Sequence, residues 1–360
     1  MGGAAWLRSG YGVAVSQPRL LGEAKIRVGA PSRMKEMSYR EALHDALVEE
    51  MRRDSSVFIM GEDIGKHGGT FKVTEGLIEE FGPLRVLETP ISESGFVGAA
   101  VGAAMMGMRP VVEIMFADFI TISMDQIVNN AAKMRYIYDG DMSVPMVIRA
   151  PQGAGVRMGV HHSQSFEAWF AHVPGLKVVI PSTPADAKGL LKSAIRDDDP
   201  VIFLEHKLLY SVKGPVPEGE HLVPIGKADV KREGTDVTVV ATSLMVHRAL
   251  AAAERLQREG ISVEVIDPRS LQPLDEETLV ASATKTGRVV VVHEAPGPYG
   301  AGAEIATVIG KGAFGYLDMP IERVTAPFVP VPFSPPLEDF VIPGEEQIVA
   351  AVRRTLGLAA

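Results

Sequence analysis

Two kinds of hydrophobic pattern alternate along the chain from about residue 38 onward. Short apolar runs, such as 144–148 and 176–180, show no alternation of polar and apolar positions, which is typical of strands covered on both faces. Between them lie stretches with helical spacing, and the first of these opens with the capping box Ser38-Tyr-Arg-Glu41. The alternation predicts an α/β fold with mostly parallel sheets.

The pattern divides the chain into two α/β cycles. The first predicts strands at about 57–60, 85–87, 110–115, 144–149, 176–180 and 201–204, with helices at about 38–53, 95–106, 119–138, 166–171 and 184–196. A segment rich in proline, glycine and charge, 213–224, indicates a surface linker. The second cycle predicts strands at 237–241, 262–266, 289–292 and 321–324, with helices at 245–258, 275–284, 303–309 and 344–356. We therefore expect a leader over 1–36, one domain over 37–210, a linker over 211–234 and a second domain over 235–357.

Composition narrows the functional class. The 360 residues are 46% hydrophobic, which is enough for two ordinary domains. The formal net charge of -9 argues against a nucleic-acid partner, and no apolar run is long enough to span a bilayer, so we expect no membrane partner. The absence of cysteine excludes disulfides, zinc-thiolate sites and a thiol nucleophile, and it fits a reducing compartment.

The leader is richer in arginine than in acid and shows no clean periodicity. Residues 1–32 carry Arg8, Arg19 and Arg27 against the single acid Glu23. Two interpretations compete: an organellar presequence, or an extension without regular structure from an upstream start codon, with Met34 or Met37 as the real beginning. We favour the second because a presequence helix should show a clearer amphipathic face. The expected location is a bacterial cytoplasm, with the mitochondrial matrix as the alternative.

The stretch 88–107 holds the best candidate for catalysis. It places Glu93 between an expected strand and a helix built almost wholly of small residues, which let another backbone or a flat ligand come close. Pro90 and Ser92 indicate a turn, and Ser92 or Ser94 is expected to cap the helix. A carboxylate in this apolar turn is costly to desolvate without a partner, which favours a functional role for Glu93.

Two further pairs follow strands. Glu62 and Asp63 stand after strand 57–60, where open α/β sheets place their sites, although a solvated turn explains them equally well. Phe116 and Phe119 follow strand 110–115. Either they offer an aromatic face to a heterocycle, or both rings belong to the core, and the sequence alone favours the core.

Two polar clusters lie farther along the chain. The glycine-rich loop 150–164 contains His161 and His162. Adjacent side chains diverge, which disfavours a shared metal and favours one proton-transferring imidazole on a loop. The run Asp197–Asp199 is either a set of cation ligands or a solvated turn between a helix and a strand, and the turn is the simpler interpretation.

Taken together, these motifs resemble the beta subunit of the thiamine-diphosphate-dependent first component of 2-oxo acid dehydrogenase complexes, of the pyruvate dehydrogenase type. The resemblance covers about 37–357. It implies a transketolase-like pyrimidine-binding domain, a parallel-sheet α/β/α sandwich, followed by a transketolase C-terminal-like α/β domain. The motifs that carry it are Gly61-Glu-Asp-Ile64, Gly68-Gly-Thr-Phe-Lys-Val-Thr74, Thr89-Pro-Ile-Ser-Glu93, Met115-Phe-Ala-Asp-Phe119, Asp125-Gln-Ile127, His162-Ser-Gln164, Pro174-Gly-Leu-Lys-Val-Val179 and Lys285-Thr-Gly-Arg288.

The resemblance implies a site for thiamine diphosphate. Glu93 matches the glutamate that hydrogen-bonds the pyrimidine nitrogen and thereby activates the cofactor. Phe119 matches the aromatic residue that packs against the pyrimidine, Ile91 lines the same pocket, and Glu62 matches an acid near the cofactor. His162 matches the histidine of the active-site loop, which is implicated in substrate positioning and in proton transfer when the acyl group passes to a lipoyl arm.

The resemblance also implies a structural metal ion. The family holds potassium through groups that match Met146, Ala194, Asp197 and Asp199. Three positions depart from the commonest pattern: Glu88 stands where Asp is usual, His161 where Gln is frequent, and Asp199 where Asn is common. None of these departures removes a catalytic group, but His161 leaves open which imidazole acts.

One absence defines the expected partners. The chain contains no Gly-Asp-Gly, the start of the magnesium motif with which related two-domain enzymes bind the cofactor's diphosphate. The resemblance thus implies an alpha subunit that holds diphosphate and magnesium in an α2β2 heterotetramer, and a lipoyl-bearing acyltransferase component. The expected substrate is a small 2-oxo acid, pyruvate first, while acetoin and branched-chain 2-oxo acids stay open. The alternative from another class is a non-catalytic assembly subunit, against which the retention of Glu93, Phe119 and His162 argues.

Overall fold

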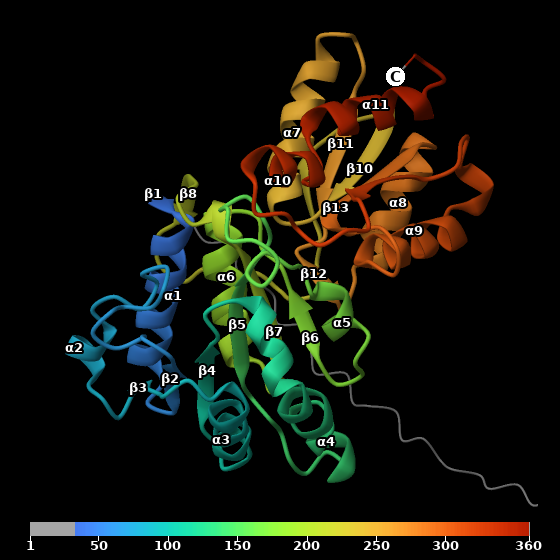
Figure 1. Cartoon of the computed structure of the whole chain (residues 1–360). Coiled ribbons are helices and arrows are strands. Elements are labelled where there is room, and N and C mark those ends of the chain that lie inside the picture. Colours follow the sequence, from blue (N-terminus) through green and yellow to red (C-terminus); the bar gives the residue numbers. More distant parts are fainter. Residues whose placement is uncertain (1–32, 360) are drawn as a thin grey trace, which may run out of the picture. The chain divides into compact units, whose positions relative to one another are not determined.

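The computed structural model describes residues 33–359, which contain two large open sheets with helices on both faces of each, and a separate pair of short strands (Figure 1). The first sheet has the strand order β12-β6-β7-β5-β4-β2-β3. Its strands are β2 (Val57–Gly61), β3 (Val86–Glu88), β4 (Arg109–Glu113), β5 (Val147–Gln152), β6 (Lys177–Val179), β7 (Val201–His206) and β12 (Ser270–Gln272). All neighbours are parallel except β12, which comes from the second half of the chain and pairs antiparallel with β6. This is the expected α/β/α sandwich.

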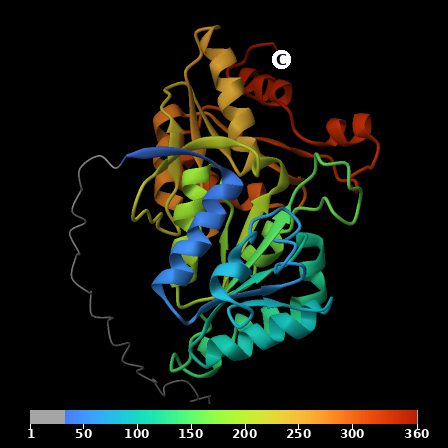
Figure 2. The ribbon, with the colours of Figure 1, turned by 90° about the vertical axis from the view of Figure 1, so that its left-hand side faces the viewer.

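Alternate strand residues face the two helical layers of this sheet. Ile59 and Val111 belong to the apolar cluster with α1 (Tyr39–Arg53) and α6 (Pro184–Arg196), which lie side by side in Figure 2. Met60 and Val112 point to the opposite layer, which contains α3 (Glu93–Met105) and α5 (Glu167–Ala171). The shorter helical segments of this half are α2 (Leu77–Phe81), α4 (Met134–Ile137) and η3 (Lys207–Leu209).

The helix expected over 119–138 is wrong as a single element. The segment forms a 3-10 helix, η1 (Ala117–Ser123), a π-helix, η2 (Gln126–Ala131), and then α4. Hydroxyl groups compete for the backbone here: Thr121 Oγ1 donates to the Asp118 carbonyl at 2.8 Å, and Ser123 Oγ donates to the Ile120 carbonyl at 3.0 Å. Such back-bonding, in a run of β-branched residues, disfavours a regular α-helix.

The second sheet has the order β14-β13-β10-β11-β9, in which only the edge strand β9 is antiparallel. The helices α7 and α11 share an apolar cluster with one face, and α8 and α9 pack with the other (Figure 1). The elements are β9 (Asp229–Arg232), β10 (Val237–Ala241), α7 (Leu244–Gln257), β11 (Val263–Asp267), α8 (Glu276–Thr286), β13 (Val289–Pro296), α9 (Ala301–Gly312), η4 (Phe314–Tyr316), β14 (Glu322–Ala326), α10 (Pro335–Val341) and α11 (Glu345–Thr355). No helix in the described range could cross a membrane.

The boundaries expected for the leader and the linker need correction. Residues 1–32 of the expected leader, 1–36, lie outside the described residues. The last three residues of that leader belong to β1 (Met34–Ser38), whose five residues pair antiparallel with β8 (Lys213–Pro217). The expected linker, 211–234, therefore contains β8 and also β9. Pairing with a distant strand gives these short segments a structure that their proline and glycine content does not indicate.

Candidate active site

Two carboxyl groups are buried at the ends of adjacent strands. Glu62 follows β2, and Glu93 is the first residue of α3, which the turn after β3 leads into. Glu62 is 6% exposed and Glu93 is 5% exposed. Burial, followed by the negative charge of Glu93, raises the pKa of Glu62. Glu62 Oε1 has no hydrogen-bond partner among residues 33–359. A like-charge pair buried without a counter-ion is costly, which is typical of a functional site.

The turn between these carboxyls exposes an apolar side chain. Ile91 is 83% exposed, although it lies only two residues before the buried Glu93. Of the two serines expected to cap α3, Ser92 and Ser94, the structure has Ser92 at the N-cap position. Its side chain makes no capping hydrogen bond. The site therefore combines an uncovered aliphatic side chain with an orphaned carboxylate oxygen, and this combination fits a planar heterocycle with polar ring atoms.

His162 packs against the two phenylalanines that follow β4. Its ring meets the ring of Phe116 edge-on, with centroids 4.7 Å apart, and that of Phe119 at 5.4 Å. Phe116 is buried, whereas Phe119 is only half-buried and leaves part of its ring accessible. His161 is exposed. The structure thus brings together His162 and Phe119 of the expected site. Phe119 lies on η1, which packs against α3, the helix that begins with Glu93.

Unsatisfied polar atoms surround the histidine. Asp118 Oδ1 accepts from Gln164 Nε2 at 2.8 Å, but Asp118 Oδ2 and the buried Ser163 Oγ have no hydrogen-bond partner in the described part of the chain. Lys207 is 5% exposed, donates to the backbone carbonyl of His162, and lies 5.5 Å from the centre of the Phe116 ring. Burial lowers the pKa of the Lys207 ammonium to about 8. Orphaned buried groups of this kind indicate ligand contacts.

Our sequence interpretation did not identify Lys207 or Asp118 as site residues. The available signal was the polar triplet Glu205-His206-Lys207 at the carboxyl end of the apolar strand β7, where sites of parallel sheets lie. Asp118 stands between the two phenylalanines that were identified.

The groups expected to hold potassium lie near one another but are already paired. Both carboxylate oxygens of Asp197 accept from Lys177 Nζ at 2.7 Å, and Asp199 accepts from Arg135 at 2.6 Å. The carbonyl of Met146 accepts from the Val201 N–H, and that of Ala194 accepts from the Asp197 N–H. Because cationic side chains neutralise the carboxylates, the donor set gives no support to a cation, and potassium at these residues stays a prediction.

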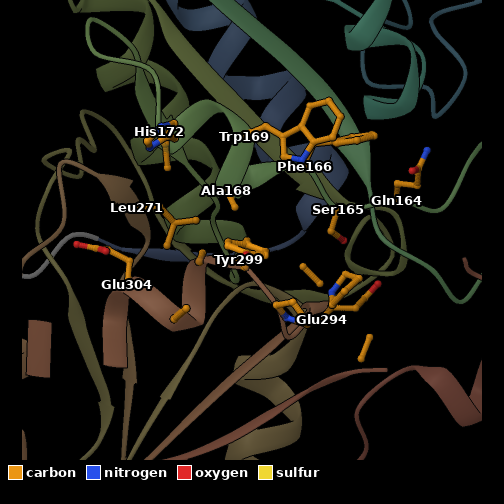
Figure 3. Close-up of a pocket in the computed structure, with 18 of the residues that line it drawn as sticks. Gln164, Ser165, Phe166, Ala168, Trp169, His172, Leu271, Glu294, Tyr299 and Glu304 are labelled. Carbon is orange, nitrogen blue, oxygen red and sulfur yellow. The ribbon is translucent and has the colours of Figure 1, made fainter. Parts of the chain in front are cut away.

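A cavity of 1240 Å³ opens next to the loop that carries His162 (Figure 3). One side is lined by Gln164, Ser165, Phe166, Ala168, Trp169 and His172, and the other by Glu294, Tyr299 and Glu304. Glu62, Glu93, Phe119 and His162 do not line this cavity. Trp169 is 55% exposed and Tyr299 is 97% exposed, so large aromatic side chains at its walls remain accessible.

The chain is similar to known families over both halves. Residues 35–213 match the transketolase pyrimidine-binding domain, and residues 226–348 match the transketolase C-terminal domain. A solved structure described as "split gene transketolase, inactive beta4 tetramer" superposes with a TM-score of 0.73 at 27% identity, covering 90% of this chain and 99% of that one. The two-domain fold expected from the sequence is therefore confirmed.

Three curated relatives are each 50% identical and cover 89% of this chain. They are the 2-oxoisovalerate dehydrogenase subunit beta of Bacillus subtilis, covered over 98% of its length; the mitochondrial pyruvate dehydrogenase E1 component subunit beta-2 of Oryza sativa subsp. japonica, covered over 86%; and the acetoin:2,6-dichlorophenolindophenol oxidoreductase subunit beta of Cupriavidus necator, covered over 98%. Since pyruvate, branched-chain and acetoin types match equally well, identity does not rank these substrates. Nevertheless, all three relatives are beta subunits of this one family, and both of its domains are matched, so the chain belongs to the beta subunits of thiamine-diphosphate-dependent 2-oxo acid dehydrogenases.

Proposed function

We propose that this chain, together with an alpha subunit, decarboxylates pyruvate with thiamine diphosphate and transfers the acyl group to a lipoyl domain. The observation that carries the proposal is the buried pair Glu62 and Glu93, with the exposed Ile91 in the turn before Glu93 and the half-buried Phe119 on η1, which packs against α3. Acetoin and branched-chain 2-oxo acids are the alternative substrates, because relatives of all three types are 50% identical to this chain.

The described residues fit the pyrimidine half of the cofactor. Glu93 would hold a ring nitrogen, Ile91 and Phe119 would pack on the ring, and the orphaned Glu62 Oε1 would meet a polar edge. When bound, thiamine diphosphate supplies the carbon nucleophile that attacks the 2-oxo acid and the electron sink for the loss of carbon dioxide.

Glu93 and Glu62 would supply the proton that activates the pyrimidine. Burial and the neighbouring negative charge of Glu93 raise the pKa of Glu62, which makes ionisation of both carboxyls together costly. A carboxyl that keeps its proton can donate a hydrogen bond to a ring nitrogen, whereas a carboxylate cannot. The low exposure of both side chains also excludes water from this hydrogen bond.

His162 would act at the other end of the reaction. Its ring is held edge-on by two phenylalanines and its carbonyl by Lys207, so the imidazole has a defined place from which to orient substrate and to exchange a proton during acyl transfer. Asp118 Oδ2 and Ser163 Oγ, which have no hydrogen-bond partner within residues 33–359, would be available to polar groups of the substrate.

The partners follow from the family and from the missing magnesium motif. The relatives are named as beta subunits, and the sequence has no Gly-Asp-Gly for the diphosphate. We propose an α2β2 heterotetramer in which the alpha subunit holds diphosphate and magnesium, acting with a lipoyl-bearing acyltransferase component. A bacterial cytoplasm is the proposed location, and a mitochondrial matrix is the alternative, because both bacterial and mitochondrial relatives are similar.

Substitution of Glu93 tests the proposal. Glu93→Gln keeps the side-chain shape but cannot donate a carboxyl proton, so decarboxylation by the tetramer should fall about 100-fold or more. Glu88→Gln, at the start of the same turn, is the matched control and should stay within about threefold. Turnover of pyruvate, acetoin and branched-chain 2-oxo acids is measured with the alpha subunit co-expressed. Wild-type turnover in the Glu93 variant would refute the role of this carboxyl, and a preference for another substrate would replace pyruvate.

A further inference from the structure

Two carboxylates of the second domain bind the backbone of the loop that carries His162. Glu294, on β13, accepts from the Ala154 N–H at 2.6 Å. Glu338, on α10, accepts from the Gly155 N–H at 2.7 Å and from the Arg157 N–H at 3.1 Å. Charge-assisted hydrogen bonds to backbone amides are among the stronger ones. We call residues 153–163 the histidine loop.

Glu338 is suited to an anchoring role because it is fully buried. Its carboxylate is 0% exposed, and it also accepts from the Arg157 guanidinium at 2.7 Å. Four N–H···O contacts of the loop thus converge on two carboxylates, and a buried carboxylate with this many donors is well stabilised.

The backbone of the loop needs such support. Arg157 has a φ of 61°, in the left-handed region, which is sterically unfavourable for a residue with a side chain. Its guanidinium is held by Glu338, by the Pro335 carbonyl at 3.1 Å, and by Asp339 at 2.7 Å. The contacts with α10 therefore offset the cost of this backbone conformation. Without them, the loop would not retain it.

The start of the loop also packs closely on the end of β7 and on η3, which follows it. A Cβ added at Gly153 would lie 2.3 Å from His206 Nε2, and one added at Gly155 would lie 2.5 Å from Leu208 Cδ1. His206 Nδ1 accepts from the Leu208 N–H at 3.2 Å, which places the ring proton on Nε2, 2.7 Å from Glu294. Burial alone would raise the pKa of Glu294, but His206 and the Ala154 N–H lower it below its ordinary value. Glu294 therefore stays an acceptor.

We propose that Glu338 and Glu294 are positioning residues, through which the second domain fixes the histidine loop and hence the place of His162 against Phe116 and Phe119. The proposal rests on the function proposed for His162. Glycine-rich loops lose much conformational entropy on ordering, and a displacement of about 1 Å at a catalytic group can cost about 100-fold in rate. The second domain would then contribute to catalysis as well as to assembly.

The experiment compares Glu338→Gln with Asp339→Asn in the assembled tetramer. Both variants remove a charge from α10 and a contact with Arg157, but Asp339 is exposed and binds no loop amide. Glu294→Gln is a second, independent variant on another element. Two quantities are measured: hydrogen exchange of the amides of Ala154, Gly155 and Arg157, and lipoyl acylation relative to decarboxylation with an artificial electron acceptor.

In Glu338→Gln and Glu294→Gln, we expect loop amides to exchange about tenfold faster or more, and acylation to fall about 10- to 100-fold with a smaller loss of decarboxylation. Asp339→Asn should stay within about twofold for both quantities. His162→Ala should show the same division between the two activities. The double variant, His162→Ala with Glu338→Gln, should lose little more acylation than His162→Ala alone, because both changes remove the same function.

Unchanged exchange in both glutamine variants would overturn the anchoring role. Additive losses in the double variant would overturn the route through His162. If His162→Ala retains full acylation, the proposed function of His162 fails, while the exchange measurement still decides whether Glu338 and Glu294 hold the loop.

Discussion

At the scale of single residues, the carboxyl of Glu62 shows most directly what the site costs the free chain. It is buried beside Glu93, and one of its oxygens has no partner in residues 33–359. Removal of this charge would stabilise the protein without its ligand. Groups that lower stability in this way are retained where they contact a ligand.

Glu62→Gln should therefore stabilise this chain in the absence of cofactor, and more so at higher pH. Because burial and Glu93 raise the pKa of Glu62 in the fold, the unfolded state binds fewer protons between the ordinary and the raised value, so the cost to the fold grows as pH rises through this range. We expect a gain of about 1 kcal/mol at pH 8 and a smaller one at pH 4, measured by urea unfolding.

Asp63→Asn is the control, because Asp63 is the exposed neighbour and asparagine tolerates its positive φ of 55°. An equal gain for Glu62→Gln at both pH values would show that repulsion and burial of its charge are not the cause.

The sequence identified site residues that carry a local signal. Glu93 stands in an apolar turn, Phe119 follows a strand end, and His162 lies on a glycine-rich loop. It did not reveal Glu294 or Glu338, which lie 140 and 183 positions from the amides they bind. An acid after a run of valines is visible in a sequence, but its distant backbone partner is not, because only the fold brings the two together.

At the scale of elements, helix α3 combines a buried face with an unusually bare outer one. Phe96 and Ala100 are buried, whereas Ala99 and Gly102 are exposed. A Cβ added at Gly102 would meet nothing within 4 Å in the described chain. Exposed apolar side chains stand near both ends of α3, with Ile91 at 83% and Met106 at 85%, and on η1 and α4, with Ile122 at 54% and Tyr136 at 89%. A bare helix face with an apolar surround suits close subunit contact in the proposed heterotetramer.

Gly102→Leu should therefore impair assembly without harming the fold. Leucine has a higher helix propensity than glycine by about 1 kcal/mol, so thermal stability of the free chain should be equal or higher. The mass of the complex with the alpha subunit, measured by light scattering, should fall. Ala251→Leu, at an exposed position of α7, is the control and should assemble normally. Normal assembly of the Gly102 variant would exclude this face from the contacts.

Elements with complete local signals were predicted well. Helix α6 has a Thr183 cap and Pro184 in its first turn, and its predicted bounds agree with the structure. The segment 119–138 was wrong because hydroxyl back-bonding interrupts it. The short strands β1, β8 and β12 were not predicted, because each consists of only three to five residues and depends on a partner distant in the sequence.

At the scale of the whole described chain, a buried charge cluster joins the two halves. Asp267, at the end of β11, accepts from Ser182 Oγ after β6. Asp186 of α6 pairs with Lys231 of β9 and with Arg269. Burial, followed by the negative charge of Asp186, raises the pKa of Asp267 to about 7. The junction therefore holds a proton that the unfolded chain releases at much lower pH.

This proton makes stability fall as pH rises. Between the ordinary aspartate pKa of about 4 and the raised value, the folded state binds more protons than the unfolded state, so each pH unit removes up to about 1.4 kcal/mol. Asp267→Asn should flatten the dependence of the unfolding free energy on pH between 5 and 7. Asp229→Asn, which changes a partly exposed partner of Lys231, should retain the wild-type slope. An unchanged slope in Asp267→Asn would assign the pH dependence to other groups.

The strand β12 has a consequence for how such a chain can be divided. It supplies the edge of a sheet whose other six strands all precede it in the sequence, and it does so from within the second half. If the chain were divided between β8 and β9, the first part would have β6 as an unpaired edge strand. The second part would carry the three-residue strand β12 without its partner. The two halves thus match separate domain families, but the second half supplies a strand of the first half's sheet.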